Sequence, residues 1–242
     1  MGLLSIARTF PNNITSIITT IAPIYAPVFI AFYAKDNFKE LIIKIKESIR
    51  TSAIIMFVPI TGFIVYSSDF YSLWQKSLSE KEVAIVSALS IITVIQAYFN
   101  TSTATLAQLS VVTNKLWRAG VASLTCGVLS ILIEFILLYT TDLGVYAIVV
   151  STTIVMILRY ILFNPIYASF CLEQKRTLFY GDVIKTWCII PALYIVMVLI
   201  RKVIPVSTWG TLFASAAVSA IVGYLLSILF LNPEFFSKLR KA

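Results

Sequence analysis

The few side chains of this 242-residue chain that could do chemistry lie inside or beside apolar stretches. Arg8 and Arg159 could each bind a phosphate group through paired N–H donors. The alternative is that both guanidinium groups lie among lipid headgroups, Arg159 by extending its long side chain. Glu134 is the one acid well inside an apolar stretch. There it could hold a coupling cation, pair with a buried base, or stay protonated and bond a neighbouring helix.

Amide side chains are a second kind of candidate. Between residues 83 and 114, polar residues recur at steps of three, four or seven, which places them on one helical face: Gln96, Asn100, Thr103, Ser110 and Asn114. Within a membrane such a face contacts either other helices or a wet cavity. In a cavity, Asn12, Gln96 and Asn100 could bond sugar hydroxyls. Gln108 lies about 80° off this face and is the weakest candidate.

The residues needed for several common kinds of catalytic and metal site are missing from the sequence. The chain has no histidine, and its three cysteines, Cys126, Cys171 and Cys188, form no CxxC pair. A Ser-His-Asp triad, a histidine metal site and a disulfide framework are therefore not expected. We expect no catalytic residue, no metal and no cofactor, so a role as an enzyme is disfavoured.

Long apolar segments must position these side chains. The mean hydropathy is +0.93, and 59% of residues are hydrophobic against 12% charged. Because about 20 apolar residues of helix cross a hydrocarbon core, we predict an all-α transmembrane bundle of seven spans. The spans are expected at 12–34, 50–67, 83–106, 119–140, 143–164, 184–201 and 207–231. Residues 35–50 alternate apolar and basic residues at helical spacing, which predicts an amphipathic helix in the cytoplasmic interface.

The basic residues predict an orientation. Of the 19 Lys and Arg residues, 13 fall in every second gap between the spans and 4 in the remaining gaps. Cytoplasmic loops hold the excess, so the C-terminus is predicted to be cytoplasmic and the N-terminus external. The net charge of +8 then reports orientation and attraction to anionic lipid, and nucleic-acid binding is not expected. Residues 1–10 have neither a basic cytoplasmic lead nor a signal-peptide pattern, which suggests a missing upstream piece.

Five blocks of sequence follow one another in a distinctive order: GLLSIARTFPNN, IAPIYAPVFIAFYAKDN, SSDFYSLW, QAYFNTSTATLAQLSVVTNKLWRAGVAS and LGVYAIVVSTTIVMILRYILFNPIYASFCL. Together they resemble the polysaccharide-exporting flippases of the multidrug/oligosaccharidyl-lipid/polysaccharide exporter superfamily. The resemblance implies two six-helix lobes around a central cavity, followed by two extra helices. By it, residues 1–172 supply five helices of the second lobe and residues 173–242 supply the extra pair.

The resemblance also implies a function and a partner. It suggests part of a transporter that flips lipid-linked oligosaccharide repeat units across the bacterial cytoplasmic membrane by alternating access. One lobe cannot enclose a site alone, so we expect the missing N-terminal half as a partner. The alternatives are half of a cation-coupled drug antiporter, with Glu134 as the ion site, and a remnant that transports nothing. A polytopic enzyme of glycan assembly is less favoured, because the external loop at 67–82 offers only scattered acids.

Overall fold

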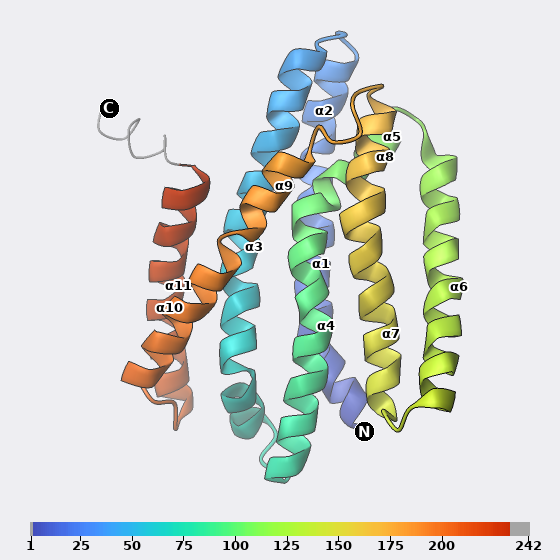
Figure 1. Cartoon of the computed structure of the whole chain (residues 1–242). Helices are drawn as coiled ribbons and strands as arrows, with labels where there is room; N and C mark the ends of the chain where they lie inside the picture. Colours follow the sequence, from blue (N-terminus) through green and yellow to red (C-terminus); the bar gives the residue numbers. More distant parts are fainter. Residues whose placement is uncertain (1, 233–242) are drawn as a thin grey trace, which may run out of the picture.

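The structure, a computed structural model, describes residues 2–232, and all regular structure within them is helical. Seven helical segments are long and apolar enough to cross a membrane: Leu3–Tyr33, Phe38–Trp74, Glu80–Val112, Leu116–Thr140, Val145–Cys171, Tyr180–Val203 and Trp209–Leu231. They stand side by side as a bundle (Figure 1). The predicted all-α bundle of seven spans is confirmed.

Most of these segments contain more than one helix. In chain order the helices are α1 (Leu3–Ile24), α2 (Ala26–Tyr33), α3 (Phe38–Trp74), α4 (Glu80–Ala107), α5 (Leu109–Val112), α6 (Leu116–Thr140), α7 (Val145–Leu158), the π-helical turn η1 (Arg159–Phe163), α8 (Asn164–Cys171), α9 (Tyr180–Trp187), α10 (Ile190–Val203) and α11 (Trp209–Leu231). The first span therefore begins at Leu3 rather than at residue 12, and the fifth runs on to Cys171.

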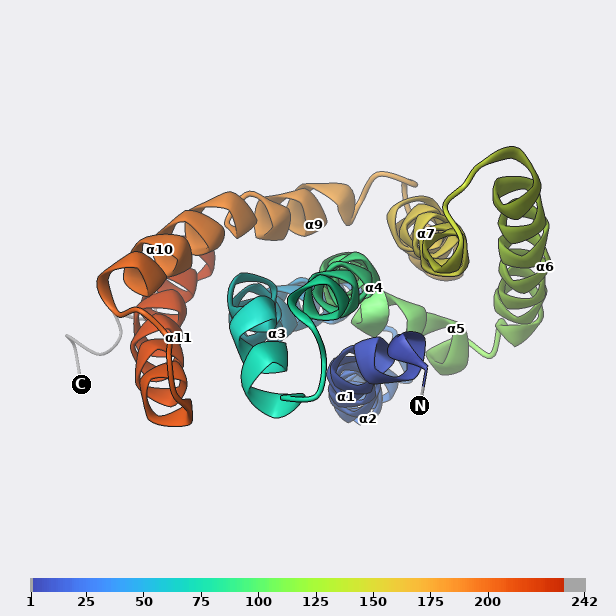
Figure 2. The ribbon, with the colours of Figure 1, turned by 90° about the horizontal axis from the view of Figure 1, so that it is seen from below.

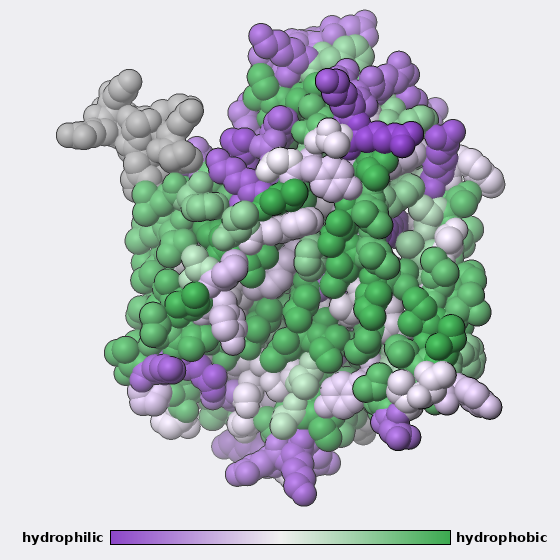
Figure 3. All heavy atoms as spheres, viewed as in Figure 1, coloured by the Kyte–Doolittle hydropathy of each residue, from purple (hydrophilic) through white to green (hydrophobic). Residues whose placement is uncertain are grey.

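The loops gather at two ends of the bundle. Loops at 34–37, 113–115 and 172–179 meet at one end, and those at 75–79, 141–144 and 204–208 at the other (Figure 1). We call the first the basic end, because its loops hold Lys35, Lys115, Lys175 and Arg176. Figure 3 shows hydrophilic residues at both ends and a hydrophobic band between them. Lys238, Arg240 and Lys241, which contributed to the predicted cytoplasmic C-terminus, lie outside the described residues.

Residues 35–50 do not form the separate interfacial helix that the sequence suggested. From Phe38 onward they are the first turns of α3, which continues without a break to Trp74. The apolar side chains of this stretch, Leu41, Ile45 and Ile49, are buried in a cluster with residues of α2, α5, α8 and α9. The predicted apolar face of this stretch is present, but it packs against protein instead of acyl chains.

Helices α3 and α4 form the centre of the bundle and are joined by hydroxyl groups. The Thr61 and Tyr98 hydroxyls are 2.8 Å apart, and those of Ser67 and Ser87 are 2.7 Å apart. All four residues are buried. Hydrogen bonds between membrane helices contribute about 0.6 kcal/mol each on average, so this pair fixes the register of the two helices more than it stabilises them.

Two prolines in these spans have freed carbonyls that another helix satisfies. Proline has no N–H, so it leaves the carbonyl four residues earlier without its helical donor. Pro11 frees the Ala7 carbonyl of α1, and Ser90 of α4 donates to that oxygen at 2.7 Å. Pro59 frees the Ile55 carbonyl of α3, and Tyr224 of α11 donates to it at 3.2 Å. Each freed carbonyl is thus bonded across an interface between helices.

The last three helices flank α3 on one side (Figure 2). Ion pairs attach two of them, α9 and α10, to α3. At the basic end, Arg50 and Lys46 of α3 contact the carboxylate of Asp182 in α9, at 2.5 and 3.2 Å. At the opposite end, Arg201 of α10 donates to Asp69 of α3 at 2.9 Å. These contacts hold α9 and α10 along the length of α3.

Helix α6 lies at the other edge of the molecule (Figure 2). It packs against α7 and, near its start, against α5. Ser130 is its only buried residue. Most of the surface of α6 is therefore available to lipid or to another polypeptide.

Candidate functional site

A polar cavity of about 350 Å³ lies between α4, α5, α6, η1 and α8. Its polar lining comes from four of these elements and consists of Ser110, Ser123, Arg159, Asn164 and Tyr167. Apolar and small residues, including Gly120 and Phe163, complete the wall. The cavity thus combines one cation with several hydrogen-bonding groups, in a region where the surrounding surface is apolar.

Arg159 supplies the charge of this cavity. Its Nη2 donates to the Ser123 hydroxyl at 2.8 Å, while its buried Nε has no hydrogen-bond partner among the described residues. No carboxylate in residues 2–232 forms an ion pair with it. A guanidinium has five N–H donors, and the terminal ones that Ser123 leaves unused can donate to a phosphate or carboxylate oxygen in the cavity.

The backbone of Arg159 lies deep within its span. It lies 14 residues after the start of the span at Val145, or about 21 Å along a helix, and 12 residues before its end at Cys171, or about 18 Å. Arg159 is therefore close to the middle of the span. From there its guanidinium reaches Ser123, six residues or about 9 Å along α6 from Trp117, and lines the polar cavity.

A local break in the helix positions Arg159. Pro165 has no N–H for the carbonyl of Ile161, and the chain responds with the π-helical turn Arg159–Phe163. Tyr180 of α9 donates to the Ile161 carbonyl at 2.8 Å. This is the third proline in the spans whose freed carbonyl is bonded by another helix. The wider π turn rotates Arg159 relative to a regular helix and is held in that geometry from outside.

The polar face of α4 borders the same region. Asn164 donates to Thr103 at 3.2 Å, which places the Thr103 position of this face against the start of α8. Gln96 and Asn100 lie on the same face further from the basic end, and both are partly buried. The Oε1 of Gln96 is buried and has no partner among the described residues. The face therefore contacts protein at Thr103 and retains unused hydrogen-bonding capacity at Gln96.

A second polar surface runs along α1. Asn12 is exposed, and the exposed residues on its side of the helix are almost all polar: Ser5, Thr9, Asn13, Ser16, Thr19 and Thr20. Several of these hydroxyls bond only carbonyls of α1 itself. An amide and hydroxyl face in a membrane span is costly against lipid. It is suited to a water-filled lumen or to another polar helix.

The structure does not bring all the predicted site residues together. Arg8 is on α1 near the end opposite the basic end, five residues or about 8 Å from the helix start, so it lies at a different depth from Arg159. Gln108 lies at the junction of α4 and α5, beside the lining residues Ala107 and Ser110. Glu134 does not line the cavity, and it lies about 9 Å from the end of α6 instead of near its centre.

Among the cavity residues that were not predicted as site residues are Ser123, Asn164 and Tyr167. The signal for Asn164 was present, because an Asn-Pro pair inside a span marks a break where polar groups need partners. Tyr167 gave no comparable signal, since aromatic residues are common in apolar spans. Its hydroxyl donates to the Lys115 carbonyl, which joins α8 to the loop before α6.

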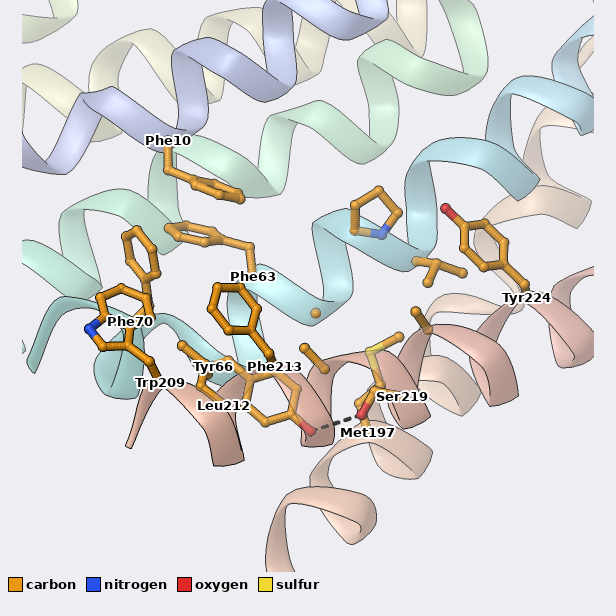
Figure 4. Close-up of a pocket in the computed structure, with 15 residues that line it drawn as sticks. Phe10, Phe63, Tyr66, Phe70, Met197, Trp209, Leu212, Phe213, Ser219 and Tyr224 are labelled. Carbon is orange, nitrogen blue, oxygen red and sulfur yellow. Dashed lines mark hydrogen bonds between the residues drawn. The ribbon is translucent and has the colours of Figure 1, made fainter. Parts of the chain in front are cut away.

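A second cavity, of about 360 Å³, is apolar and lies between α1, α3, α10 and α11. Phe10 stacks on Phe63 there, with ring centroids 4.1 Å apart, and Phe70, Trp209 and Phe213 extend the aromatic wall (Figure 4). The Tyr66 hydroxyl turns away to Ser219, at 2.8 Å. The lining has no charged group, so this cavity fits hydrocarbon and offers nothing to bind an anionic headgroup.

Comparison with known proteins gives one distant relative. The chain is 22% identical over 208 residues to the "Uncharacterized membrane protein EpsK" of Bacillus subtilis (strain 168), and the match covers 85% of this chain. The matched region spans 40% of that relative's length. No family model and no solved structure matches the chain.

Proposed function

We propose that the chain is one part of a transporter that flips lipid-linked oligosaccharide repeat units across a bacterial cytoplasmic membrane. The observation that carries the proposal is Arg159, a cation with a free N–H near the middle of a span, in a polar cavity large enough for a phosphate group. A cation within a membrane span is by default a candidate functional site. The substrate class itself rests on the sequence resemblance to polysaccharide-exporting flippases.

We assign each chemical group of the substrate to the surface whose side chains suit it. Arg159 and Asn164 would bind the anionic phosphate groups, and the polar face of α1 around Asn12 would contact sugars in a lumen. The hydrocarbon tail would stay in the bilayer or along the apolar cavity between α3 and α11. In this scheme Glu134 has no part in substrate binding, because it lies outside the polar cavity.

A partner is part of the proposal. The exposed polar face of α1 needs something other than lipid against it, and the exposed apolar surface of α6 is open to lipid or to another polypeptide. A second lobe, supplied by the same or another polypeptide, would enclose them and form the alternating-access cavity. The matched relative is consistent with this arrangement, since it is a longer membrane protein. We further propose that the basic end is cytoplasmic.

The proposed function is tested by measuring polysaccharide export after the charge of Arg159 is removed. In cells that carry the complete transporter, Arg159→Gln should slow surface polysaccharide export about tenfold, the effect of losing one charge-assisted hydrogen bond. The export rate of Arg159→Lys should lie between those of the wild type and Arg159→Gln, because lysine keeps the charge but lacks the paired N–H donors of arginine. Lys175→Gln, an exposed charge in the 172–179 loop, is the matched control.

Protein levels in the membrane must be measured alongside export. Normal export by Arg159→Gln at a normal protein level would contradict the proposal. Orientation is tested separately by reporter fusions at Lys115 and Gln75, for which we expect cytoplasmic and external signals respectively. The reverse pair of signals would refute the proposed orientation without touching the role of Arg159.

A further inference from the structure

A groove of about 330 Å³ lies at the basic end, between the start of α6 and the end of α8. Its cations are Lys115 and Arg118, and both sit over one aromatic ring. The Arg118 guanidinium carbon is 4.5 Å from the centroid of Phe170, and the Lys115 Nζ is 5.3 Å from it. The two cationic groups therefore lie close to the same ring in the groove.

The charge of this groove is only partly neutralised. Lys115 contacts Glu173 at 3.4 Å, but that carboxylate is 84% exposed, so the pair is weak. Arg118 has no ion pair within residues 2–232. Two cations three residues apart on a helix repel each other. They also stand at the positive end of the α6 dipole, where acids are favoured and none is present in the first turn. An anion in the groove would relieve all of these repulsions.

The position of the groove indicates what kind of molecule carries the anion. Trp117 at one end of α6 is 82% exposed and Tyr139 near the other is 94% exposed. They are 22 residues, or about 33 Å, apart along the helix, close to the thickness of a hydrocarbon core. Exposed Trp and Tyr mark the two membrane interfaces. The groove is therefore at headgroup level, and exposed apolar residues such as Leu124 continue below it.

We propose that this groove, formed by Lys115, Trp117, Arg118 and Phe170, binds the phosphate of an anionic phospholipid in the leaflet at the basic end. Arg118 and Lys115 would contact the phosphate oxygens, and Trp117 would lie against the upper acyl chain. The site is separate from the Arg159 cavity. It does not depend on the proposed transport function, because it needs only the bilayer as its source of ligand.

The two sites are nevertheless neighbours. Leu116 and Tyr167 line both the groove and the Arg159 cavity. A phospholipid in the groove would therefore rest against the wall of the cavity. Occupation of the groove would also hold the start of α6, a helix that packs mainly on α7.

Native mass spectrometry of the purified full chain tests the site. Detergent micelles containing equal amounts of phosphatidylglycerol and phosphatidylcholine should give retained phosphatidylglycerol on the wild type. Arg118→Gln should lower that retention about tenfold, the effect of losing one charge-assisted contact. Arg118→Lys should retain most of it. Arg176→Gln removes an exposed charge at the same end that has no cation–π partner within residues 2–232, and it should leave the retention unchanged.

Three results would overturn the proposal. Equal losses for Arg118→Gln and Arg176→Gln would mean that surface charge alone attracts the lipid. Unchanged retention in Arg118→Gln would mean that the lipid binds elsewhere. Displacement by inorganic phosphate at the concentration of the lipid would mean that the groove binds a free anion. Circular dichroism of each variant separates a lost site from a lost fold.

Discussion

Helices α3 and α6 are both apolar enough to span a membrane, yet they have opposite surroundings. In the most apolar window of the α3 segment 61% of the residues are buried, against 6% in that of α6. Helix α3 is bonded to α4, α9, α10 and α11 through hydroxyls, ion pairs and a proline kink. Helix α6 has one main neighbour. Hydropathy thus identifies a membrane helix without telling whether protein or lipid surrounds it.

The largest expected effect tests this difference directly. Phe57→Ala on α3 removes a fully buried ring and should destabilise the chain by about 3 to 5 kcal/mol. Phe135→Ala on α6 removes a ring that is 67% exposed and should cost less than about 1 kcal/mol. Equilibrium unfolding in mixed detergent micelles measures the loss of stability in both variants. Similar losses would mean that a partner buries α6 under the conditions of the measurement.

A smaller effect is expected where α3 meets α9. Asp182→Asn leaves Arg50 and Lys46 without their acid and should cost about 2 kcal/mol. The matched control is Asp142→Asn in the exposed loop after α6, since Asp142 has no ion pair within the described residues. If the two variants have the same free energy of unfolding, the contact between α9 and α3 does not stabilise the bundle. High salt should narrow the difference between them.

The smallest effect concerns single hydroxyl groups. Ser90→Ala removes the nearer donor to the Ala7 carbonyl and should destabilise by about 1 kcal/mol, because only the longer bond from the Tyr71 hydroxyl, at 3.4 Å, then remains. Thr125→Ala on α6 removes a hydroxyl that bonds only its own helix, at Val121, and should have almost no effect. Hydrogen exchange of the α1 amides near Pro11 gives a second, local measurement. Unchanged exchange there in Ser90→Ala would refute the role of this hydroxyl.

Much of the fold was predictable because length and apolar composition define a membrane helix. The exact ends of the helices were less predictable. The sequence cannot distinguish an apolar face that contacts acyl chains from one that contacts protein, and this is why residues 38–50 were assigned to the interface rather than to α3.

The candidate site was predictable only by residue type. Arg159 stood out because a cation inside an apolar span is unusual. Its neighbours Ser123 and Asn164 depend on how α6 and α8 are placed, which is information about contacts distant in sequence. Arg8 and Glu134 had the same kind of signal as Arg159, but depth along the helix separates them from the cavity. Charge in a span identifies candidates, and the fold selects among them.

The three bonded proline kinks link positions that lie far apart in the chain. Without Pro59, the Tyr224 hydroxyl would compete with a helical N–H for the Ile55 carbonyl; without Tyr224, that carbonyl would be left in an apolar setting. The same reasoning applies to Pro11 with Ser90 and to Pro165 with Tyr180. Among homologous chains, each proline and its hydroxyl donor should therefore be gained and lost together, so that covariation between distant columns of an alignment would record the kinks.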